Sequence, residues 1–261
     1  ANTDQLTVTV TSTSATASQL TTVAGATGLN VTATAVEAIT NSSVAQVKTL
    51  LLVEGSTGDK VNLDGDFTVA INDTGTVDAA DLNTINDATT ELVTATGVAT
   101  INGSASAITT LIGNEGTSGD KVALDTDFAM TVSSGQATVD QANTMAAFAT
   151  SGAITATISN GDIADLDGLT TANTDQLTVT VTSTSATALQ LTTVAGATGL
   201  NVTATAVETV TGTATQMDAL LLAEGSTGDK INLDDNYNIT ISGSNATVDQ
   251  ANAYGAATDG V

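Results

Sequence analysis

The sequence is unusual first for the residue types that it lacks. Its 261 residues include no Cys, Pro, His or Trp, and its only basic residues are four lysines. Without cysteine there is no disulfide staple, and without histidine a serine has no partner for a catalytic triad. No phosphate-binding glycine loop appears either. We therefore expect a protein that is not an enzyme.

Basic residues are too few for several common kinds of partner. The 4 Lys+Arg stand against 28 Asp+Glu, for a net charge of −24. Nucleic acids and anionic membrane surfaces both attract basic residues, so we expect neither as a partner. The most apolar runs, Leu50–Val53 and Met145–Ala149, are far shorter than a membrane span, so we expect no membrane insertion. The charge is compatible with divalent cations and with self-repulsion that keeps a polymer in solution.

Aromatic residues are also scarce, at 2% of the chain, although 41% of the residues are hydrophobic. The interior must therefore be built from Ala, Val, Leu and Ile, which suit a thin, layered core. A sugar-cleaving cleft would normally be lined with aromatic side chains, so their scarcity argues against a glycosidase. The abundant Thr and Val favour strands, whereas Gly, Asn and Asp favour turns.

What the sequence does contain is a long internal repeat. The segment 1–37, which begins ANTDQLTVTVTSTSATA, returns as 172–208 with one difference, Ser18 against Leu189. This helix position tolerates both residues, so we expect it to be peripheral. Repeats of this kind predict an architecture of similar units packed on one another.

The repeat also sets the predicted domain organisation. Residues 1–171 form a first long repeat of about six strand–helix repeats, and residues 172–261 form a partial second one of about three. Each strand–helix repeat has about 29 residues. Both ends of the chain lie within the pattern, so we expect a segment of a longer repetitive chain.

The strand–helix repeat is read from hydrophobic periodicity. Leu6–Thr11 alternates as a half-buried strand does, and Ser14–Thr27 places Leu20, Val23 and Ala24 on one helix face. Asp78, Asp140 and Asp249 occupy positions typical of helix N-caps. The same patterns predict further helices at Ser43–Val53, Asp78–Asp87, Ser104–Leu111, Val139–Ala149 and Asp162–Leu169.

Strands that alternate with short helices favour parallel pairing, and regular short repeats favour stacking. The predicted fold is a β-rich repeat protein, an elongated β-solenoid-like stack with a short helix in each repeat. The alternative is a string of tandem β-sandwich domains. The segment Leu63–Phe67 supports that alternative, because its Asp-Gly pair is a strong hairpin signal.

A shorter motif, the lysine module, recurs three times. It reads EGSTGDKVNLDGDFTVAI from Glu54, EGTSGDKVALDTDFAMTV from Glu115 and EGSTGDKINLDDNYNITI from Glu224. Its aromatic position is most simply a core anchor, as is the equivalent pair Met145 and Tyr254. The aromatic position holds Phe67, Phe128 and Tyr237, and the lysine position holds Lys60, Lys121 and Lys230. We interpret each lysine as one half of a structural ion pair with the module's glutamate or a neighbouring aspartate.

Each lysine module also contains an acidic turn. The turn residues are Asp64, Asp66, Asp125, Asp127, Asp234 and Asp235, and Asp165 with Asp167 is a similar pair. Hard oxygen ligands at a turn suit Ca²⁺, which is the one cofactor that the sequence suggests. The other interpretation is that Asp, Gly and Asn simply make turns. The ligand spacings of EF-hands and of calcium β-rolls are absent.

The phrases SATASQLTTVAGATGLNVTATAVEAIT, TVDAADLNTINDAT and LDGLTTANTDQLTVTV resemble the giant Thr/Ala/Asp-rich repeat proteins of bacterial, particularly cyanobacterial, surfaces. These are S-layer, swimming-associated or adhesin-like proteins. The resemblance implies secretion, display on the cell surface and assembly, often with calcium. It adds no catalytic residue.

We therefore expect an extracellular structural protein, a segment of a surface layer, fibre or sheath that assembles through stacked repeats. The alternative is a calcium-dependent adhesin stalk that spaces a binding domain from the cell. The expected partners are further copies of the repeat and, at the cell surface, polysaccharide.

Overall fold

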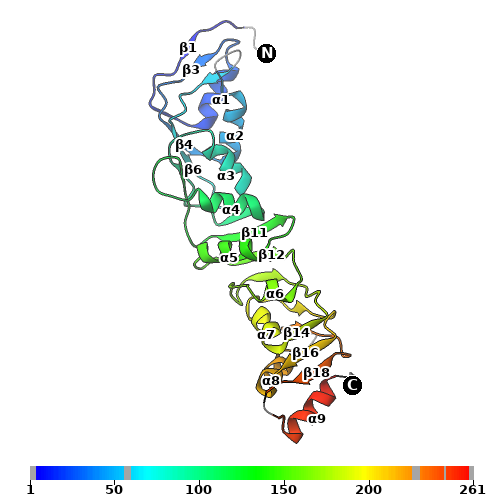
Figure 1. The fold of residues 1–261 in the computed structure, drawn as a ribbon. Helices are drawn as coiled ribbons and strands as arrows, with labels where there is room; N and C mark the ends of the chain where they lie inside the picture. Colours follow the sequence, from blue (N-terminus) through cyan, green and yellow to red (C-terminus); the bar gives the residue numbers. More distant parts are fainter. Residues whose placement is uncertain (1–3, 56–59, 225–229, 244, 259–261) are drawn as a thin grey trace. The chain divides into compact units, whose positions relative to one another are not determined.

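The structure is a computed structural model that describes residues 4–55, 60–224, 230–243 and 245–258 (Figure 1). The chain forms two compact units, Ala1–Ala129 and Met130–Val261, here called the N-terminal and C-terminal units. Each unit is described by itself.

In the N-terminal unit, short strands alternate with helices along the chain. The helices are α1 (Ala17–Gly25), α2 (Val44–Val53), α3 (Ala79–Asn86) and α4 (Ala105–Gly113). The strands are β1 (Val8–Thr9), β2 (Ser14–Ala15), β3 (Val31–Thr32), β4 (Ala38–Ser42), β5 (Val61–Asn62), β6 (Thr68–Ile71), β7 (Thr76–Asp78), β8 (Val93–Thr94), β9 (Thr100–Ser104) and β10 (Val122–Ala123). Each helix packs on the next, so that α1 to α4 lie in a row in Figure 1.

Strands of the N-terminal unit pair with strands of neighbouring repeats, and every described pair is parallel. One sheet has the order β1-β3-β5, and a second has the order β10-β8-β6-β4-β2. Strand β7 pairs with β9. Equivalent residues face one another across the repeats, since Val31 lies opposite both Val8 and Val61. The repeats therefore stack in register.

The C-terminal unit is built in the same way. Its helices are α5 (Val139–Phe148), α6 (Ile163–Leu166), α7 (Ala188–Gly196), α8 (Ala214–Ala223) and α9 (Val248–Ala257). Its strands are β11 (Ala129–Ser134), β12 (Ile154–Thr157), β13 (Gln176–Thr178), β14 (Ser185–Thr187), β15 (Val202–Thr203), β16 (Thr209–Gly212), β17 (Ile231–Asn232) and β18 (Asn238–Ile241). Parallel pairing joins β11 to β12 and β12 to β13, β14 to β16 and β16 to β18, and β15 to β17.

Polar residues fix where the helices begin. Six helices start with a capping box, in which the N-cap hydroxyl accepts the N3 backbone N–H and the N3 glutamine accepts the N-cap N–H. Asp78 caps α3 as predicted. The prediction is wrong for Asp140 and Asp249, because Thr138 and Thr247 are the N-caps and the aspartates lie in the first helical turn. A carboxylate is favourable there because it faces the positive end of the helix dipole.

Side chains of the following repeat complete these helix starts. The buried Ser42 hydroxyl accepts the backbone N–H of Ala17 at 2.9 Å, and the Asp73 carboxylate accepts that of Val44 at 2.7 Å. Ser183 accepts the N–H of Ile163 at 2.9 Å. The first turn of a helix leaves its N–H groups without partners inside the helix. Hydrogen bonds between repeats therefore satisfy groups that a single repeat leaves open.

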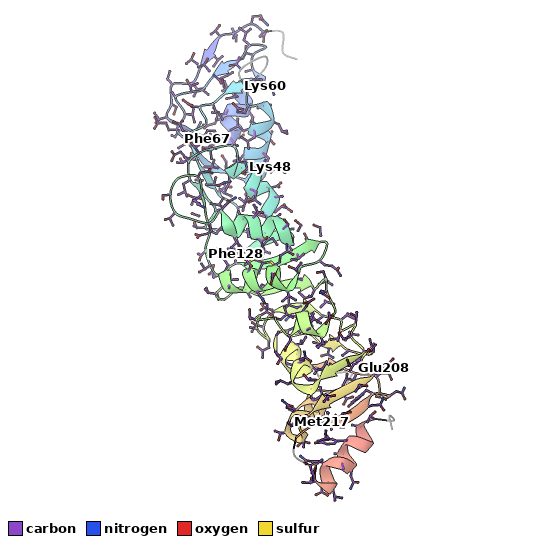
Figure 2. All side chains as sticks on the ribbon, in the orientation of Figure 1. Lys48, Lys60, Phe67, Phe128, Glu208 and Met217 are labelled. Carbon is purple, nitrogen blue, oxygen red and sulfur yellow. The ribbon has the colours of Figure 1, made fainter. Side chains whose placement is uncertain are left out.

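The core contains the residues that the composition predicts. Ala, Val, Leu and Ile fill most of it, and each fully buried Leu or Ile contributes about 1.5–3 kcal/mol. The predicted core anchors are confirmed, since Phe67, Phe128 and Tyr237 are all at most 2% exposed. Figure 2 labels Phe67 and Phe128. Met145 and Tyr254 are buried as well. Leu189 is 55% exposed and Ser18 is exposed, as expected of a peripheral position.

The fold is α/β, with parallel strands and short helices that alternate along the chain. The β-rich description is too narrow, because helices of four to ten residues accompany strands of two to six. The tandem β-sandwich alternative is wrong, because the fold is not all-β. The hairpin at Leu63–Phe67 is also wrong, since β5 and β6 belong to different sheets.

Candidate functional site

The predicted calcium residues lie at exposed corners between consecutive strands. Asp64 and Asp66 lie between β5 and β6, Asp125 and Asp127 between β10 and β11, and Asp234 and Asp235 between β17 and β18; all six are exposed. The first aspartate of each corner accepts a nearby backbone N–H, that of Gly65 at 3.1 Å, Thr126 at 2.7 Å and Asn236 at 3.3 Å. Each therefore fixes the local turn, as the second interpretation expects.

Two of these corners open onto grooves with further carboxylates. Asp64 lines a groove of about 320 Å³ together with Glu54 and Asp87. Asp234 lines another, of about 390 Å³, together with Glu208. Within the described residues, no three His, Cys, Asp or Glu side chains are placed to hold one metal ion. Calcium binding at these corners stays a prediction.

Two lysines of the lysine modules, Lys60 and Lys121, donate hydrogen bonds to helix ends. Lys60 Nζ donates to the carbonyl of Leu52 at 3.1 Å, and Lys121 Nζ donates to the carbonyl of Gly113 at 3.4 Å. The acceptors belong to the last turns of α2 and α4, where carbonyls lack partners inside the helix and a positive charge is favourable. Among the described residues the one ion pair joins Lys48 Nζ to Asp81 Oδ1 at 2.5 Å. The ion-pair interpretation is therefore wrong for Lys121 and for Lys60 with Glu54, whereas Asp59, the aspartate next to Lys60, lies outside the described residues.

A backbone bridge closes each lysine module around its lysine. Glu54 pairs with Val61, Glu115 with Val122 and Glu224 with Ile231, all in parallel. In the second module the glycine after the glutamate leaves room for the lysine stem, because a Cβ on Gly116 would lie 2.8 Å from Lys121 Cγ. In that module the Glu-Gly pair and the lysine therefore belong to one local structure. The recurrence of the motif indicated a structural role, but the helix-end contact was not predicted.

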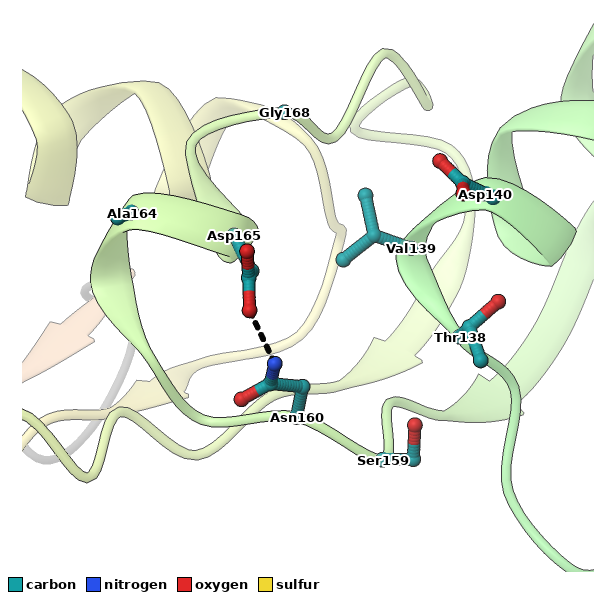
Figure 3. A pocket seen from close by; sticks show the side chains of 8 residues that line it. All are labelled: Thr138, Val139, Asp140, Ser159, Asn160, Ala164, Asp165 and Gly168. Carbon is teal, nitrogen blue, oxygen red and sulfur yellow. Dashed lines mark hydrogen bonds between the residues drawn. The ribbon is translucent and has the colours of Figure 1, made fainter.

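A groove in the C-terminal unit lies between helix α5 and the segment 159–168 (Figure 3). It has a volume of about 490 Å³ and is lined by Thr138, Val139, Asp140, Ser159, Asn160, Ala164, Asp165 and Gly168. The Asn160 amide donates to the Asp165 carboxylate, and Val139 projects into the groove. The groove thus offers two carboxylates, hydroxyls and an amide. The chain has no histidine or cysteine to act on a bound substrate there.

Two buried tyrosines donate hydrogen bonds to carboxylates of the C-terminal unit. Tyr237 donates to Glu224 Oε2 at 2.8 Å, and Tyr254 donates to Asp218 Oδ1 at 2.8 Å and to the carbonyl of Ala214 at 2.9 Å. Burial raises the pKa of Glu224, and the hydrogen bond from Tyr237 opposes that rise. The pKa of Tyr254 is raised to about 12; burial is the largest cause, and the hydrogen bond to Asp218 is the second. Burial also raises the pKa of Tyr237, with its hydrogen bond to Glu224 as the second cause.

These tyrosines occupy core positions of the repeat and not a cleft. Phe67 and Phe128 fill the position of Tyr237, and Met145 fills that of Tyr254, without a hydroxyl. Their raised pKa values therefore reflect packing inside the repeat. We assign them a structural role.

No helix in the described parts of the chain has both the length and the hydropathy of a membrane span. Comparison of the chain with protein-family models, with curated proteins and with solved structures found no match.

Proposed function

We propose that this chain is part of an extracellular structural protein, a segment of a surface layer, fibre or sheath that assembles through stacked repeats. The observation that carries the proposal is the near-identity of residues 1–37 and 172–208, which a structural repeat requires and an active site does not. The parallel, in-register pairing of successive repeats within each unit supports it. We infer that the repeats form a solenoid-like stack.

The proposed mechanism is mechanical. Each repeat buries small apolar side chains against its neighbours and leaves acidic and Thr-rich residues outside. The net charge of −24 keeps such stacks apart in solution and limits non-specific association. Specific association then occurs at strand edges, where backbone N–H and C=O groups seek partners.

The edges of the described sheets support this mode of assembly. β1 and β2 are the first strands of their sheets, and β18 is the last strand of its sheet. We propose that further copies of the repeat pair with such edges, and that the acidic, hydroxyl-rich exterior faces cell-surface polysaccharide.

Sedimentation velocity over a range of protein and salt concentrations tests the assembly. We expect a concentration-dependent increase in size, and electron micrographs of the assembled material should show a lattice or an axial periodicity. A chain that stays monomeric at every salt and Ca²⁺ concentration would contradict the proposal. Protease accessibility on intact cells tests display at the surface.

The second candidate function is a calcium-dependent adhesin stalk. The observation that favours it is the pair of grooves lined by more than one carboxylate, Asp64 with Glu54 and Asp87 in one and Asp234 with Glu208 in the other. Calorimetry with Ca²⁺ and then with a chelator tests it. The stalk proposal expects a raised unfolding temperature that the chelator reverses, and an unchanged unfolding temperature would exclude it.

A further inference from the structure

The two copies of the long repeat have the same sequence but different exposure. In the first copy (residues 4–27) Leu6 is 59% exposed, whereas its equivalent in the second copy (residues 175–198), Leu177, is 0% exposed. Five more equivalent pairs are partly or fully exposed in the first copy and buried in the second: Val8 and Val179, Val10 and Val181, Ala15 and Ala186, Val23 and Val194, and Ala26 and Ala197. We call these six residues of the first copy the leading face.

Local folding does not explain this difference, because the two copies share the hydrogen bond at this leucine. Thr27 donates to the carbonyl of Leu6 at 2.7 Å, and Thr198 donates to that of Leu177 at 2.8 Å. Contacts with the following repeat also agree, since β1 pairs with β3 just as Thr180 bridges to Thr203. The difference therefore lies in the segment that covers the second copy in the structure.

The second copy is covered by residues 154–169, which we call the linking repeat. Its strand β12 pairs with β13 and sets Ala156 opposite Leu177. Ser183 accepts the N–H of Ile163 at 2.9 Å, and the carbonyl of Gly161 accepts the N–H of Thr182 at 2.7 Å. Helix α6 packs against α7. Main-chain pairing and helix packing thus both contribute to the burial of Leu177.

The linking repeat and the second copy pack closely against each other at Gly161. A Cβ on Gly161 would lie 2.5 Å from the carbonyl oxygen of Thr180, so any other residue would push the linking repeat away. The first copy offers the same oxygen on Thr9 and the same hydroxyl on Ser12. In the first copy Ser12 donates to its own neighbour, Ser14, at 2.6 Å. Among the described residues, β1 has a strand partner on one side, β3.

The opposite side of the linking repeat covers helix α5. Asn143 of α5 donates to the carbonyl of Gly168 at 2.8 Å and accepts the N–H of Thr170 at 2.8 Å. Helix α9 has the sequence VDQANAYGAA where α5 has VDQANTMAAF. Val139 of α5 is half-buried, whereas its equivalent in α9, Val248, is 77% exposed. Ala142 is buried, whereas its equivalent, Ala251, is exposed. We call Val248, Ala251 and Asn252 the trailing face.

We propose that the leading face and the trailing face are docking surfaces for one kind of partner, a strand–helix segment with the chemistry of the linking repeat. The chain itself supplies the evidence for this occupant, because residues 154–169 cover the equivalents of both faces in the C-terminal unit. One such segment, placed between two copies of the chain, would join the trailing face of one copy to the leading face of the next. This inference rests on the proposed function and names the partner through which the repeats continue.

A fusion tests the leading face. Residues 150–171 are added directly ahead of Ala1, which reproduces the order found ahead of Ala172. Amide hydrogen exchange of residues 4–15 is then compared with that of the unfused chain. We expect exchange to slow about tenfold or more, because backbone groups at an open edge become paired and buried. The matched control carries valine at the added position that corresponds to Gly161, and its exchange should stay fast.

The same fusion tests the trailing face. Its linking repeat should bind the trailing face of a second copy, so we expect head-to-tail oligomers in sedimentation velocity. Val248→Asp should abolish these oligomers while the protection of residues 4–15 remains. If the fused chain loses its circular dichroism signal, a synthetic peptide of residues 150–171 is added to the unfused chain, and the same exchange is measured.

The outcomes separate the two proposals. Equal exchange in the fusion and in its valine control would overturn the docking proposal, even if the unfused chain assembles through other surfaces. Protection in the fusion together with no assembly of any variant would support docking and contradict the proposed function. Oligomers that survive Val248→Asp would show that the trailing face is not the second docking surface.

Discussion

At the residue scale, the stem of Lys121 occupies space that is open only because residue 116 is a glycine. The stem of Lys121 lies where a Cβ on Gly116 would be, and its Nζ reaches the end of α4. Because the glycine and the lysine share this space, their substitutions should not act independently.

We predict that Gly116→Ala lowers the free energy of unfolding by about 1–3 kcal/mol, the usual cost of overpacking. Lys121→Ala alone should cost about 0.5–1 kcal/mol, because one favourable contact at a helix C-terminus is lost. The double variant should cost less than the sum of the two. Urea denaturation of the four proteins measures this coupling, and strict additivity would show that the two side chains do not compete for space.

The hydroxyl of Tyr237 gives a second prediction at this scale. Tyr237→Phe removes the hydrogen bond to Glu224 and should lower the free energy of unfolding by about 1 kcal/mol at neutral pH. The cost stays modest because Phe67 and Phe128 fill the same position in the other lysine modules. Thermal unfolding of the variant checks this value.

Glu224 adds a dependence on pH. Its pKa is raised in the folded state, so burial penalises the ionised form. The stability that Glu224 contributes is present below its ordinary pKa of 4.5 and is lost as the pH rises through the raised value. We expect Glu224→Gln to reduce the loss of stability between pH 4 and pH 7, measured by urea denaturation at each pH. Glu115→Gln, at the equivalent position, is the matched control, and an equal effect of both variants would contradict the assignment to Glu224.

At the scale of elements, hydrogen bonds between repeats stabilise the first turns of helices. Ser42 and Ser43 are adjacent in sequence but accept hydrogen bonds from different helices. Ser42 accepts the N–H of Ala17 in α1, whereas Ser43 caps its own helix, α2. Substituting each serine in turn therefore separates the contribution of the contact between repeats from that of the helix cap.

We predict that Ser42→Ala lowers the free energy of unfolding by about 1–3 kcal/mol, because it leaves a buried N–H without its partner. Ser43→Ala should cost about 1 kcal/mol, which is typical of an N-cap. Amide hydrogen exchange distinguishes the two, since Ser42→Ala should speed exchange at Ala17 and Ser43→Ala at Gln46. Unchanged exchange at Ala17 in Ser42→Ala would show that Ser42 does not act on α1.

The helices were predictable from the sequence because their signals are local. The predicted Val139–Ala149 and Ser43–Val53 agree with α5 and α2 to within a residue at each end. The corner at Asp64-Gly65 was not predictable in the same way. A tight turn between two strands looks like a hairpin locally, but β5 and β6 pair with strands of neighbouring repeats. Pairing partners depend on which repeats stack, and a local pattern does not contain that information.

The candidate sites also differ in whether the sequence alone could identify them. Phe67 and Tyr237 were identifiable as core anchors because large side chains are rare in this chain and recur at one position. The contact of Lys60 with the end of α2 was not identifiable, because it depends on the position of Lys60 relative to the preceding helix in three dimensions. The exposure of Leu6 against the burial of Leu177 could not be predicted either, since the two residues have the same neighbours in sequence for many positions.

At the scale of the whole molecule, the net charge of −24 opposes both folding and assembly. Salt screens this repulsion, since the Debye length falls from about 30 Å at 0.01 M to about 8 Å at 0.15 M. Calcium would act in addition if it binds at the acidic corners. Screening and site binding can be separated, because screening depends on charge alone and binding depends on position.

We predict that NaCl raises the unfolding temperature of the chain and promotes its association. If Ca²⁺ binds at the acidic corners, it should raise the unfolding temperature further at equal ionic strength. The variant Asp64→Asn with Asp66→Asn should then lose part of the calcium effect and keep the salt effect. The control, Glu37→Gln with Asp140→Asn, removes the same charge at two exposed positions outside the corners. An equal calcium response in both variants would assign the effect to screening and would leave the corners with the structural role that their hydrogen bonds already show.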